Sequence, residues 1–358
     1  TMGNRGGGLK EYREVVESEP VVQGGCIWDW VDQSFREVDA HGKWYWAYGG
    51  DYGPENIPSF GNFCCNGLVN AVREPHPHLK EVKKAYQYIK CTLKDPKNLT
   101  IAIKNWYDFT NLNAYVLKWS IMGDNGKMLA KGEQSIEVAP HATTEVSLGG
   151  VRLPRNIREA YLNLSWTPKK KSAFIGTDDE VAYDQFVLPA NSQYRPTLAK
   201  LSEKPEIQID PKTGALTSYI YEGQEYLASP VRLSLYRPAT DNDNREKKGG
   251  AKVWRKLGLN HLVQRVLSVK TSGHTTYSEV KLLNDKNETI GSATFEYTIR
   301  KDGILSVQTR FVPDTTFVSS LARVGLVFEM PHSFNRVTYL GRGEHETYAD
   351  RKLSGRIG

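Results

Sequence analysis

The sequence is poor in cysteine and lacks the short motifs that mark many cofactor-dependent enzymes. Four cysteines occur among 358 residues, two of them adjacent at positions 64 and 65. No cysteine spacing matches a zinc or redox motif, so we predict reduced, mostly buried thiols. A nucleophile elbow, a P-loop and a dinucleotide fingerprint are also missing. These absences argue against nucleotide binding, zinc chemistry and a serine nucleophile.

Long apolar runs and long runs of one charge are missing too. No apolar stretch reaches the length of a membrane-spanning helix, so we expect no membrane partner. The net charge is +6, but basic clusters such as Lys169-Lys170-Lys171 are short and mixed with acidic residues. No nucleic-acid motif accompanies them, so we expect no nucleic-acid partner. A secretory signal is absent, but the chain starts in mid-motif at Thr1-Met2-Gly3-Asn4, and we expect its real N-terminus elsewhere.

The abundant residues are aromatic. Eight Trp and nineteen Tyr accompany 39% hydrophobic and 25% charged residues, a globular composition with an aromatic excess. Such an excess is typical of β-rich folds and of surfaces that stack on the flat faces of sugar rings. The length predicts two or three domains.

The first eighty or so residues have an α/β pattern. Leu9, Tyr12, Val15 and Val16 predict a helix that ends before Pro20. Residues 21–30 then predict a buried strand, and residues 77–89 a second helix with apolar positions at 79, 82, 86 and 89. Helix, strand, long loop and helix are typical of the end of a (β/α)8 barrel, where loops after the strands build the active site.

The remainder is mostly β. Residues 94–97 predict a linker, and alternation over 115–121 and 160–166, with a turn at 124–126, predicts an immunoglobulin-like sandwich. A second boundary lies near residues 191–205. Alternation over 231–235, with turns at 213–214 and 284–285, predicts a further sandwich. Because no closing signal precedes Gly358, we interpret that sandwich as part of a larger one.

Residues 24–33, with two Trp and two Asp at the end of a predicted barrel strand, are the most distinctive segment. They fit a sugar-binding wall with an indole stacked on a pyranose, and fit equally a packed core with Asp residues capping the loop. Oxygen atoms in the loop of residues 49–53 and 62–68 could bind a hard cation, but taken alone this sequence is better explained as a glycine-rich loop with turn-forming Asn residues. His76 and His78 have the wrong spacing for a helical zinc pair and are interpreted as helix-entry residues.

Six strings in fixed order lead to a family. They are residues 23–33, 48–53, 62–68, 75–77, 237–244 and 339–351. Together they closely resemble the large bacterial β-galactosidases of glycoside hydrolase family 2, over essentially the whole chain. The resemblance implies a mostly β, multidomain chain: residues 1–90 form the C-terminal end of a TIM barrel, 91–192 an immunoglobulin-like β-sandwich, and 193–358 the first part of a large, galactose mutarotase-like β-sandwich.

The resemblance also implies a retaining hydrolase of terminal non-reducing β-D-galactose residues, which uses two glutamates and a covalent glycosyl-enzyme. The family's nucleophile lies in a Glu-Tyr-Ala-His string that leads directly into Met2-Gly3-Asn4. Both glutamates would therefore lie upstream, and we expect residues 1–358 to be inactive alone. Family members are often tetramers, so we expect a tetramer or dimer of the full-length protein. The location, bacterial cytoplasm or periplasm, stays open.

Site residues follow from the same resemblance. Trp28 matches the indole that lines the galactose pocket. The main-chain oxygen of Phe63 and the side chain of Asn66 match ligands of a sodium ion beside the galactose 6-hydroxyl. The principal magnesium ligands would lie upstream. The loop between Gly53 and Phe63 is longer than in the family pattern, and Asn56 is the residue we place as a secondary magnesium ligand.

Two alternatives stay open. The chain could be a non-catalytic sandwich module that binds carbohydrate or scaffolds assembly. It could also be one subunit of a split enzyme whose partner supplies the missing barrel. An isolated barrel remnant would expose a strand edge and an apolar face, which disfavours its free existence.

Overall fold

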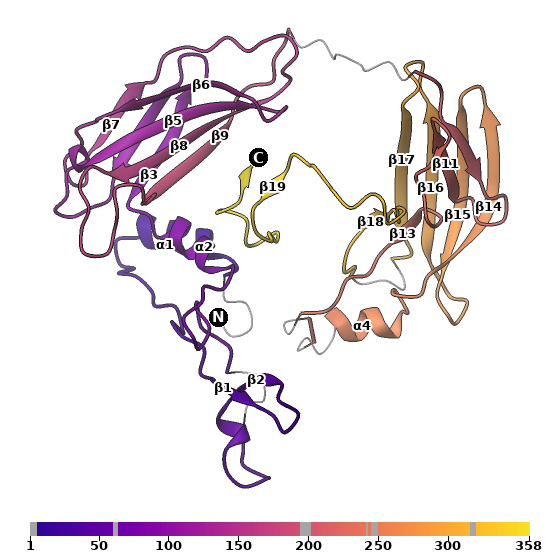
Figure 1. The fold of residues 1–358 in the computed structure, drawn as a ribbon, viewed down its shortest axis with the longest axis horizontal. Coiled ribbons are helices and arrows are strands. Elements are labelled where there is room, and N and C mark those ends of the chain that lie inside the picture. Colours follow the sequence, from indigo (N-terminus) through magenta and orange to yellow (C-terminus); the bar gives the residue numbers. More distant parts are fainter. Residues whose placement is uncertain (1–5, 60–63, 194–201, 241–242, 245–249, 316–319) are drawn as a thin grey trace. The chain divides into compact units, whose positions relative to one another are not determined.

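The chain folds into two compact units. A computed structural model describes residues 6–59, 64–193, 202–240, 243–244, 250–315 and 320–358. Unit 1 comprises Thr1–Thr197 together with Tyr339–Gly358, and unit 2 comprises Leu198–Thr338. Each unit is described by itself, with the elements labelled in Figure 1. Within the described residues, no helix is long and apolar enough to span a membrane.

The N-terminal part of unit 1 contains two short helices and a hairpin. They are α1 (Leu9–Ser18), β1 (Phe35–Val38), β2 (Trp44–Ala47), a 3₁₀ turn (Gly49–Asp51) and α2 (Leu79–Ala85). The prediction that the first helix ends before Pro20 is confirmed. The second predicted helix is too long, because Ile89 begins β3 (Ile89–Asp95) and lies fully buried in the sandwich core. Packing in that core overrides the helical spacing of the apolar residues.

The predicted buried strand at residues 21–30 is wrong. The segment is irregular, and Val21, Trp28 and Trp30 are exposed. A parallel strand needs hydrogen-bonding neighbours, and among the described residues no strand pairs with residues 21–28. In the part of the chain that the structure describes, the one parallel pairing is the isolated bridge between Val31 and Val69.

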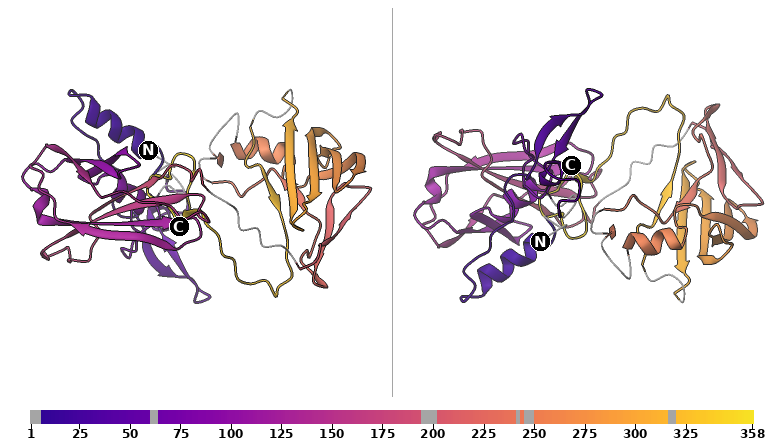
Figure 2. Two further views of the ribbon diagram at one scale, coloured as in Figure 1. Left: turned by 90° about the horizontal axis from the view of Figure 1, so that it is seen from above. Right: turned by 90° about the horizontal axis from the view of Figure 1, so that it is seen from below.

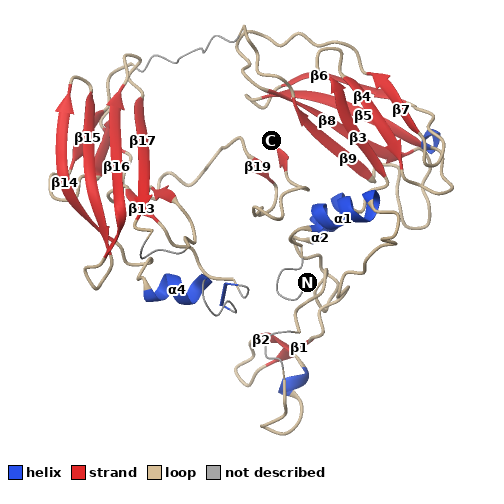
Figure 3. Ribbon diagram, turned by 180° about the vertical axis from the view of Figure 1, so that it is seen from behind, coloured by secondary structure: helices blue, strands red, loops and turns tan. Residues whose placement is uncertain are grey.

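The second part of unit 1 is the predicted sandwich (Figures 1 and 3). Its sheets have the orders β3-β4-β7 and β6-β5-β8-β9. The alternation predicted for residues 115–121 and 160–166 is confirmed, since its inward residues form one core with the fully buried Trp166. The further strands are β4 (Thr100–Asn105), β5 (Tyr115–Gly123), β6 (Met128–Gln134), β7 (Thr143–Ser147), β8 (Ala160–Pro168) and β9 (Ala182–Val187), with a 3₁₀ turn at Leu112–Ala114.

Residues 94–97 are not a linker. They span the end of β3 and the start of the turn to β4, where Asp95 Oδ1 accepts the main-chain N–H of Lys97 at 2.8 Å. The charged, proline-containing sequence that suggested a linker is equally typical of a hairpin turn. The predicted turn at 124–126 is confirmed: Gly126 has a left-handed φ of 74° between β5 and β6.

Unit 2 is built on a four-stranded sheet, β14-β15-β16-β17, whose strands run side by side in Figures 1 and 2. The predicted alternation over residues 231–235 is confirmed, since Val231, Leu233 and Leu235 are buried in its core. The elements are β10 (Glu206–Ile209), β11 (Leu216–Tyr221), β12 (Gln224–Glu225), β13 (Arg232–Ser234), α4 (Gly250–Lys256), β14 (Val263–Ser272), β15 (Thr275–Leu283), β16 (Thr289–Ile299), β17 (Leu305–Pro313) and β18 (Gly325–Val327).

Residues 339–358, called the tail below, return to unit 1 and carry the short strands β19 (Arg342–Gly343) and β20 (Arg356–Ile357). The helices are tied to the sandwich by charged side chains. Lys90 of β3 pairs with Glu17 of α1, and Lys84 of α2 pairs with Asp184 of β9 at 2.7 Å. The N-terminal helices, the sandwich and the tail therefore belong to one compact unit.

All four cysteines are free, as predicted. Cys64 and Cys91 are buried and Cys65 is partly buried, whereas Cys26 is exposed because its segment has no neighbouring strand.

Candidate functional site

Trp28 lies exposed on a segment that is bonded to the segment of Asn66. The N–H of Asp29 donates to the carbonyl of Asn66 at 3.0 Å, and the N–H of Leu68 donates back to the carbonyl of Asp29 at 3.0 Å. The Trp28 side chain is 70% exposed, so it is not part of an apolar core. The peptide bond between Trp28 and Asp29 is cis. The structure thus brings two of the predicted site segments together and leaves the indole available to a ligand.

A buried carboxylate fixes these segments to each other. Asp32 Oδ1 accepts the N–H of Gly67 at 2.6 Å, and Asp32 Oδ2 bonds His76 Nε2 at 2.7 Å. His78, which precedes α2, bonds the carbonyl of Gly67 through Nε2 at 3.0 Å. Asp32 is only 6% exposed; its bond to Gly67 is buried and its bond to His76 is partly buried, so losing the first leaves a donor without water and is costly. The segment that contains Asn66 and Gly67 is therefore bonded both to the Trp28 segment and to the residues that precede α2.

Gly67 is required by close approach of the backbone. A Cβ there would lie 2.3 Å from the nitrogen of Asp32, 2.4 Å from the carbonyl carbon of Val31 and 2.5 Å from the oxygen of Val69. These are main-chain atoms of two segments, which cannot rotate away as a side chain could. Any side chain at position 67 must push the Trp28 and Asn66 segments apart.

We therefore expect Gly67→Ala to lower the free energy of unfolding of unit 1 by about 1–3 kcal/mol, the usual cost of overpacking. Urea unfolding followed by tryptophan fluorescence measures the change. Gly25→Ala is the matched control, because a Cβ at Gly25 meets nothing within 4 Å. Equal stability of the two variants would show that the segments separate without cost.

The side chain of Asn66 is buried, and its polar atoms have no hydrogen-bond partner within the described part of the chain. It is 4% exposed, and neither its Oδ1 nor its Nδ2 has a partner among the residues that the structure describes. An unsatisfied buried amide costs about 1–3 kcal/mol, so this group is suited to a ligand, a cation or a bound water. Its oxygen is of the type that hard cations prefer, so the residue fits the predicted sodium ligand.

The other predicted ligands give no further support. Phe63 lies outside the described residues. Asn56 is exposed in the turn that follows Pro54. Among the described residues, no group of three or more His, Cys, Asp or Glu side chains could hold a metal ion. The magnesium assignment of Asn56 stays a prediction.

Sequence reasoning missed Asp32, His76 and Gly67 as organisers of the site. Asp32 was interpreted only as a possible loop cap, and His76 as a helix-entry residue. Asp32 and His76 lie 44 positions apart in sequence and are brought together by the fold. Two signals were available in the sequence: the two Asp residues of segment 24–33, and a histidine flanked by prolines at positions 75 and 77. They identify the residues but do not show that Asp32 and His76 bond each other.

The carboxylate oxygens of Asp29 and Asp32, close to Trp28 in sequence, all accept hydrogen bonds within the protein. Asp29 Oδ1 accepts the N–H of Trp30 at 2.6 Å, and Asp29 Oδ2 accepts Gln33 Nε2 at 3.1 Å. Both oxygens of Asp32 are used as described above. These two carboxylates therefore serve as hydrogen-bond acceptors within the fold and are not free to act as acid and nucleophile.

A groove of about 660 Å³ runs between α1 and residues 22–27. It is lined by apolar side chains such as Val15, Val16 and Ile27, and Tyr12 and Val15 of α1 remain at least half exposed. Exposed apolar surface of this kind is typical of a face that packs against further polypeptide.

Family models match the chain in three consecutive stretches. Residues 1–91 match the glycosyl hydrolases family 2 TIM barrel domain, 101–189 match domain 4 of β-galactosidase, and 202–358 match the β-galactosidase small chain. The chain belongs to glycosyl hydrolase family 2. The predicted series of a barrel end, an immunoglobulin-like sandwich and a second sandwich is confirmed for this family 2 chain.

Curated relatives align over nearly all of the family 2 chain. A β-galactosidase of Priestia megaterium is 35% identical over 99% of this chain and 36% of its own length. β-Galactosidase 2 of Enterobacter cloacae is 31% identical over 100% of this chain and 37% of its own length. The family 2 chain thus spans little more than a third of these relatives. An exo-chitosanase of Amycolatopsis orientalis aligns over 69% of this chain and 29% of its own, at 8% identity and a TM-score of 0.24, too weak a likeness for any argument.

Proposed function

We propose that residues 1–358 supply part of the sugar-binding wall of a retaining β-galactosidase, which removes terminal non-reducing β-D-galactose from β-galactosides. The observation that carries the proposal is the exposed indole of Trp28, on a segment whose next residue, Asp29, is hydrogen-bonded to the main chain of the buried Asn66. An indole face is suited to stacking on the apolar face of a pyranose. The names of the aligned relatives support the choice of galactoside.

In this proposal the reacting carboxylates come from other polypeptide. A retaining mechanism needs one carboxylate as nucleophile and one as acid and base, about 5–5.5 Å apart. The carboxylate of Asp29 instead bonds Trp30 in its own segment, and that of Asp32 links its segment to Gly67. The exposed apolar face of α1 and the unpaired segment 21–28 are where that polypeptide would pack, whether as the rest of the same chain or as a partner subunit.

Sodium and magnesium are proposed as cofactors. The side-chain oxygen of Asn66 and the main-chain oxygen of Phe63 would hold sodium, which would help to orient a sugar hydroxyl. The role of this chain is then to place the Asn66 amide, through the hydrogen bonds that Asp32 makes to Gly67 and His76. The principal magnesium ligands would come from outside residues 1–358.

The test uses the complete protein that contains these residues. Trp28→Ala is expected to lower kcat/KM for an aryl β-galactoside at least about fivefold, because a stacked aromatic contributes about 1 kcal/mol beyond burial and 1.36 kcal/mol is a tenfold change in rate. Trp44→Ala, which removes an exposed indole of the β1–β2 hairpin, is the control. Replacing sodium chloride by choline chloride should raise KM in the unmodified protein and have little effect in Asn66→Ala.

Equal kcat/KM for the Trp28 and Trp44 variants would contradict the stacking role. Sodium dependence that persists in Asn66→Ala would contradict the cation site.

A further inference from the structure

The tail is held by a buried carboxylate of α2. Glu81 is 2% exposed; its Oε1 accepts the N–H of Leu353 at 2.9 Å and its Oε2 the N–H of Ser354 at 2.8 Å. Both oxygens therefore bind main-chain groups of consecutive tail residues. Burying a carboxylate costs free energy unless its oxygens accept hydrogen bonds. The tail N–H groups supply these bonds, so the burial of Glu81 depends on the tail being in place.

Strand β9 contributes two further side chains, and they too bond the main chain of the tail. Tyr183 Oη donates to the carbonyl of Ser354 at 2.8 Å. Gln185 makes a pair of bonds with Ile357: Nε2 donates to its carbonyl at 2.9 Å and Oε1 accepts its N–H at 2.7 Å. Recognition of main-chain donors and acceptors is how a protein surface binds an extended segment.

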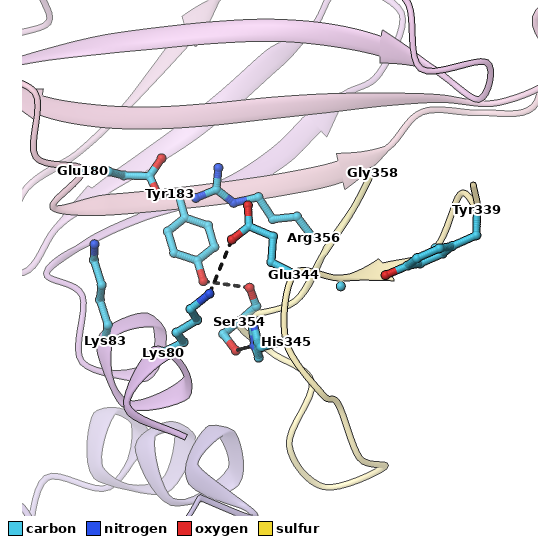
Figure 4. A pocket seen from close by; sticks show the side chains of 12 residues that line it. Lys80, Lys83, Glu180, Tyr183, Tyr339, Glu344, His345, Ser354, Arg356 and Gly358 are labelled. Atoms are coloured by element: carbon cyan, nitrogen blue, oxygen red, sulfur yellow. Dashed lines mark hydrogen bonds and ion pairs between the residues drawn. The ribbon is translucent and has the colours of Figure 1, made fainter. Parts of the chain in front are cut away.

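Ion pairs lie around these bonds (Figure 4). Arg356 pairs with Glu180 and places its guanidinium 3.9 Å from the centre of the Tyr183 ring. Lys80 pairs with Glu344 at 3.4 Å, where the Glu344 side chain is 87% exposed. A cavity of about 480 Å³ remains open here, and these side chains form part of its walls. The cavity therefore lies beside the tail, which supplies part of its lining.

We propose that Glu81, Tyr183 and Gln185 form a docking site for residues 353–357, in which Glu81 recognises the tail by its two consecutive N–H groups. The bound segment is the extended tail of the same chain. It offers the N–H groups of residues 353, 354 and 357 and the carbonyls of residues 354 and 357. In terms of the family segments, docking holds the end of the stretch matched to the small chain against both the barrel stretch, through α2, and the domain 4 stretch, through β9. This inference does not depend on the galactoside proposal.

Hydrogen exchange of the 358-residue chain tests the docking site. We expect the amides of Leu353, Ser354 and Ile357 to be protected. Glu81→Ala should lower the protection of the first two by about 10–100-fold, because each loses a bond to a charged acceptor. Glu344→Gln is the control: it removes a solvent-exposed ion pair of the same tail and should change protection by less than about twofold.

Because Glu81→Ala could weaken unit 1 as a whole, a second variant leaves Glu81 in place. Ser354→Pro removes the donor instead and should lower protection at Leu353 and Ile357 while the amides of β5 keep theirs. Full protection of Leu353 and Ile357 in this variant would overturn the proposal. So would an equal fall in β5 and the tail in both variants, which would mean that Glu81 serves the fold of unit 1 and not the tail.

Discussion

Residues 1–358 on their own are expected to hydrolyse a chromogenic β-galactoside no faster than buffer does. Enzymes lower barriers by about 8–23 kcal/mol, and in a retaining glycosidase most of this requires two free carboxylates. Asp29 uses both carboxylate oxygens in hydrogen bonds within its own segment, and Asp32 uses both to bind Gly67 and His76. A stacked Trp28 contributes about 1 kcal/mol, which cannot compensate.

The measurement is release of the chromophore over several hours, with the complete protein assayed in parallel. Turnover that co-purifies with the 358-residue chain through successive columns, and that Trp28→Ala reduces, would refute the expectation. Galactose titration of the same preparation, followed by the fluorescence difference between the unmodified chain and Trp28→Phe, reports separately on sugar binding without catalysis.

Lys84→Met is expected to lower the free energy of unfolding of unit 1 by about 3–5 kcal/mol, the usual effect of removing one partner of a buried ion pair. The Lys84 ammonium donates to Asp184 Oδ1 at 2.7 Å, to Gln87 Oε1 at 3.2 Å and to the carbonyl of Tyr183. The Lys84 side chain is 8% exposed and that of Asp184 16%. Methionine fills a similar volume but leaves three acceptors without their donor.

Burial lowers the pKa of Lys84 below its ordinary value, and Asp184 offsets this only in part. A lowered lysine pKa in the folded state means that folding disfavours the ammonium. The associated stability is present above the ordinary lysine pKa and is lost as the pH falls through the lowered value. The cost of Lys84→Met comes from the acceptors that the substitution leaves unpaired.

Urea unfolding at pH 7 measures the loss. Adding Asp184→Asn to Lys84→Met should recover part of the lost stability, because the amide carries no uncompensated charge. In the unmodified protein Asp184 Oδ2 accepts the N–H of Cys91 at 3.0 Å, and the amide oxygen of asparagine can accept the same bond. A loss below about 1 kcal/mol in the single variant would show that water reaches Asp184 and replaces the ammonium.

The sandwich domains could be predicted from the sequence because their strands alternate. Leu117, Ile121 and Leu162 point inward at period two and all lie in one core. The same local reasoning failed at Ile89, whose helical spacing from Val82 and Tyr86 was overridden by burial in that core. It also failed at residues 21–30, since a parallel strand is defined by neighbours that may be distant in sequence.

The candidate site was predictable in its residues but not in its connections. Trp28 and Asn66 followed from the family resemblance, and the structure links their segments through the main chain of Asp29. The carboxylate that fixes them, Asp32, bonds partners 35 and 44 positions away. No periodicity encodes such a pairing, because it depends on how the two segments cross.

The return of the tail to unit 1 makes unit 2 an insertion within a discontinuous domain. Residues 198–338 leave from one part of unit 1 and rejoin another, so their chain forms a closed loop as long as Glu81 keeps Leu353 and Ser354 bound. After a single backbone cleavage inside unit 2, each of the two fragments would still carry part of unit 1, and the contacts within unit 1 would hold the fragments together. Both pieces would remain associated under native conditions and separate only in denaturant, although the covalent chain between them is broken.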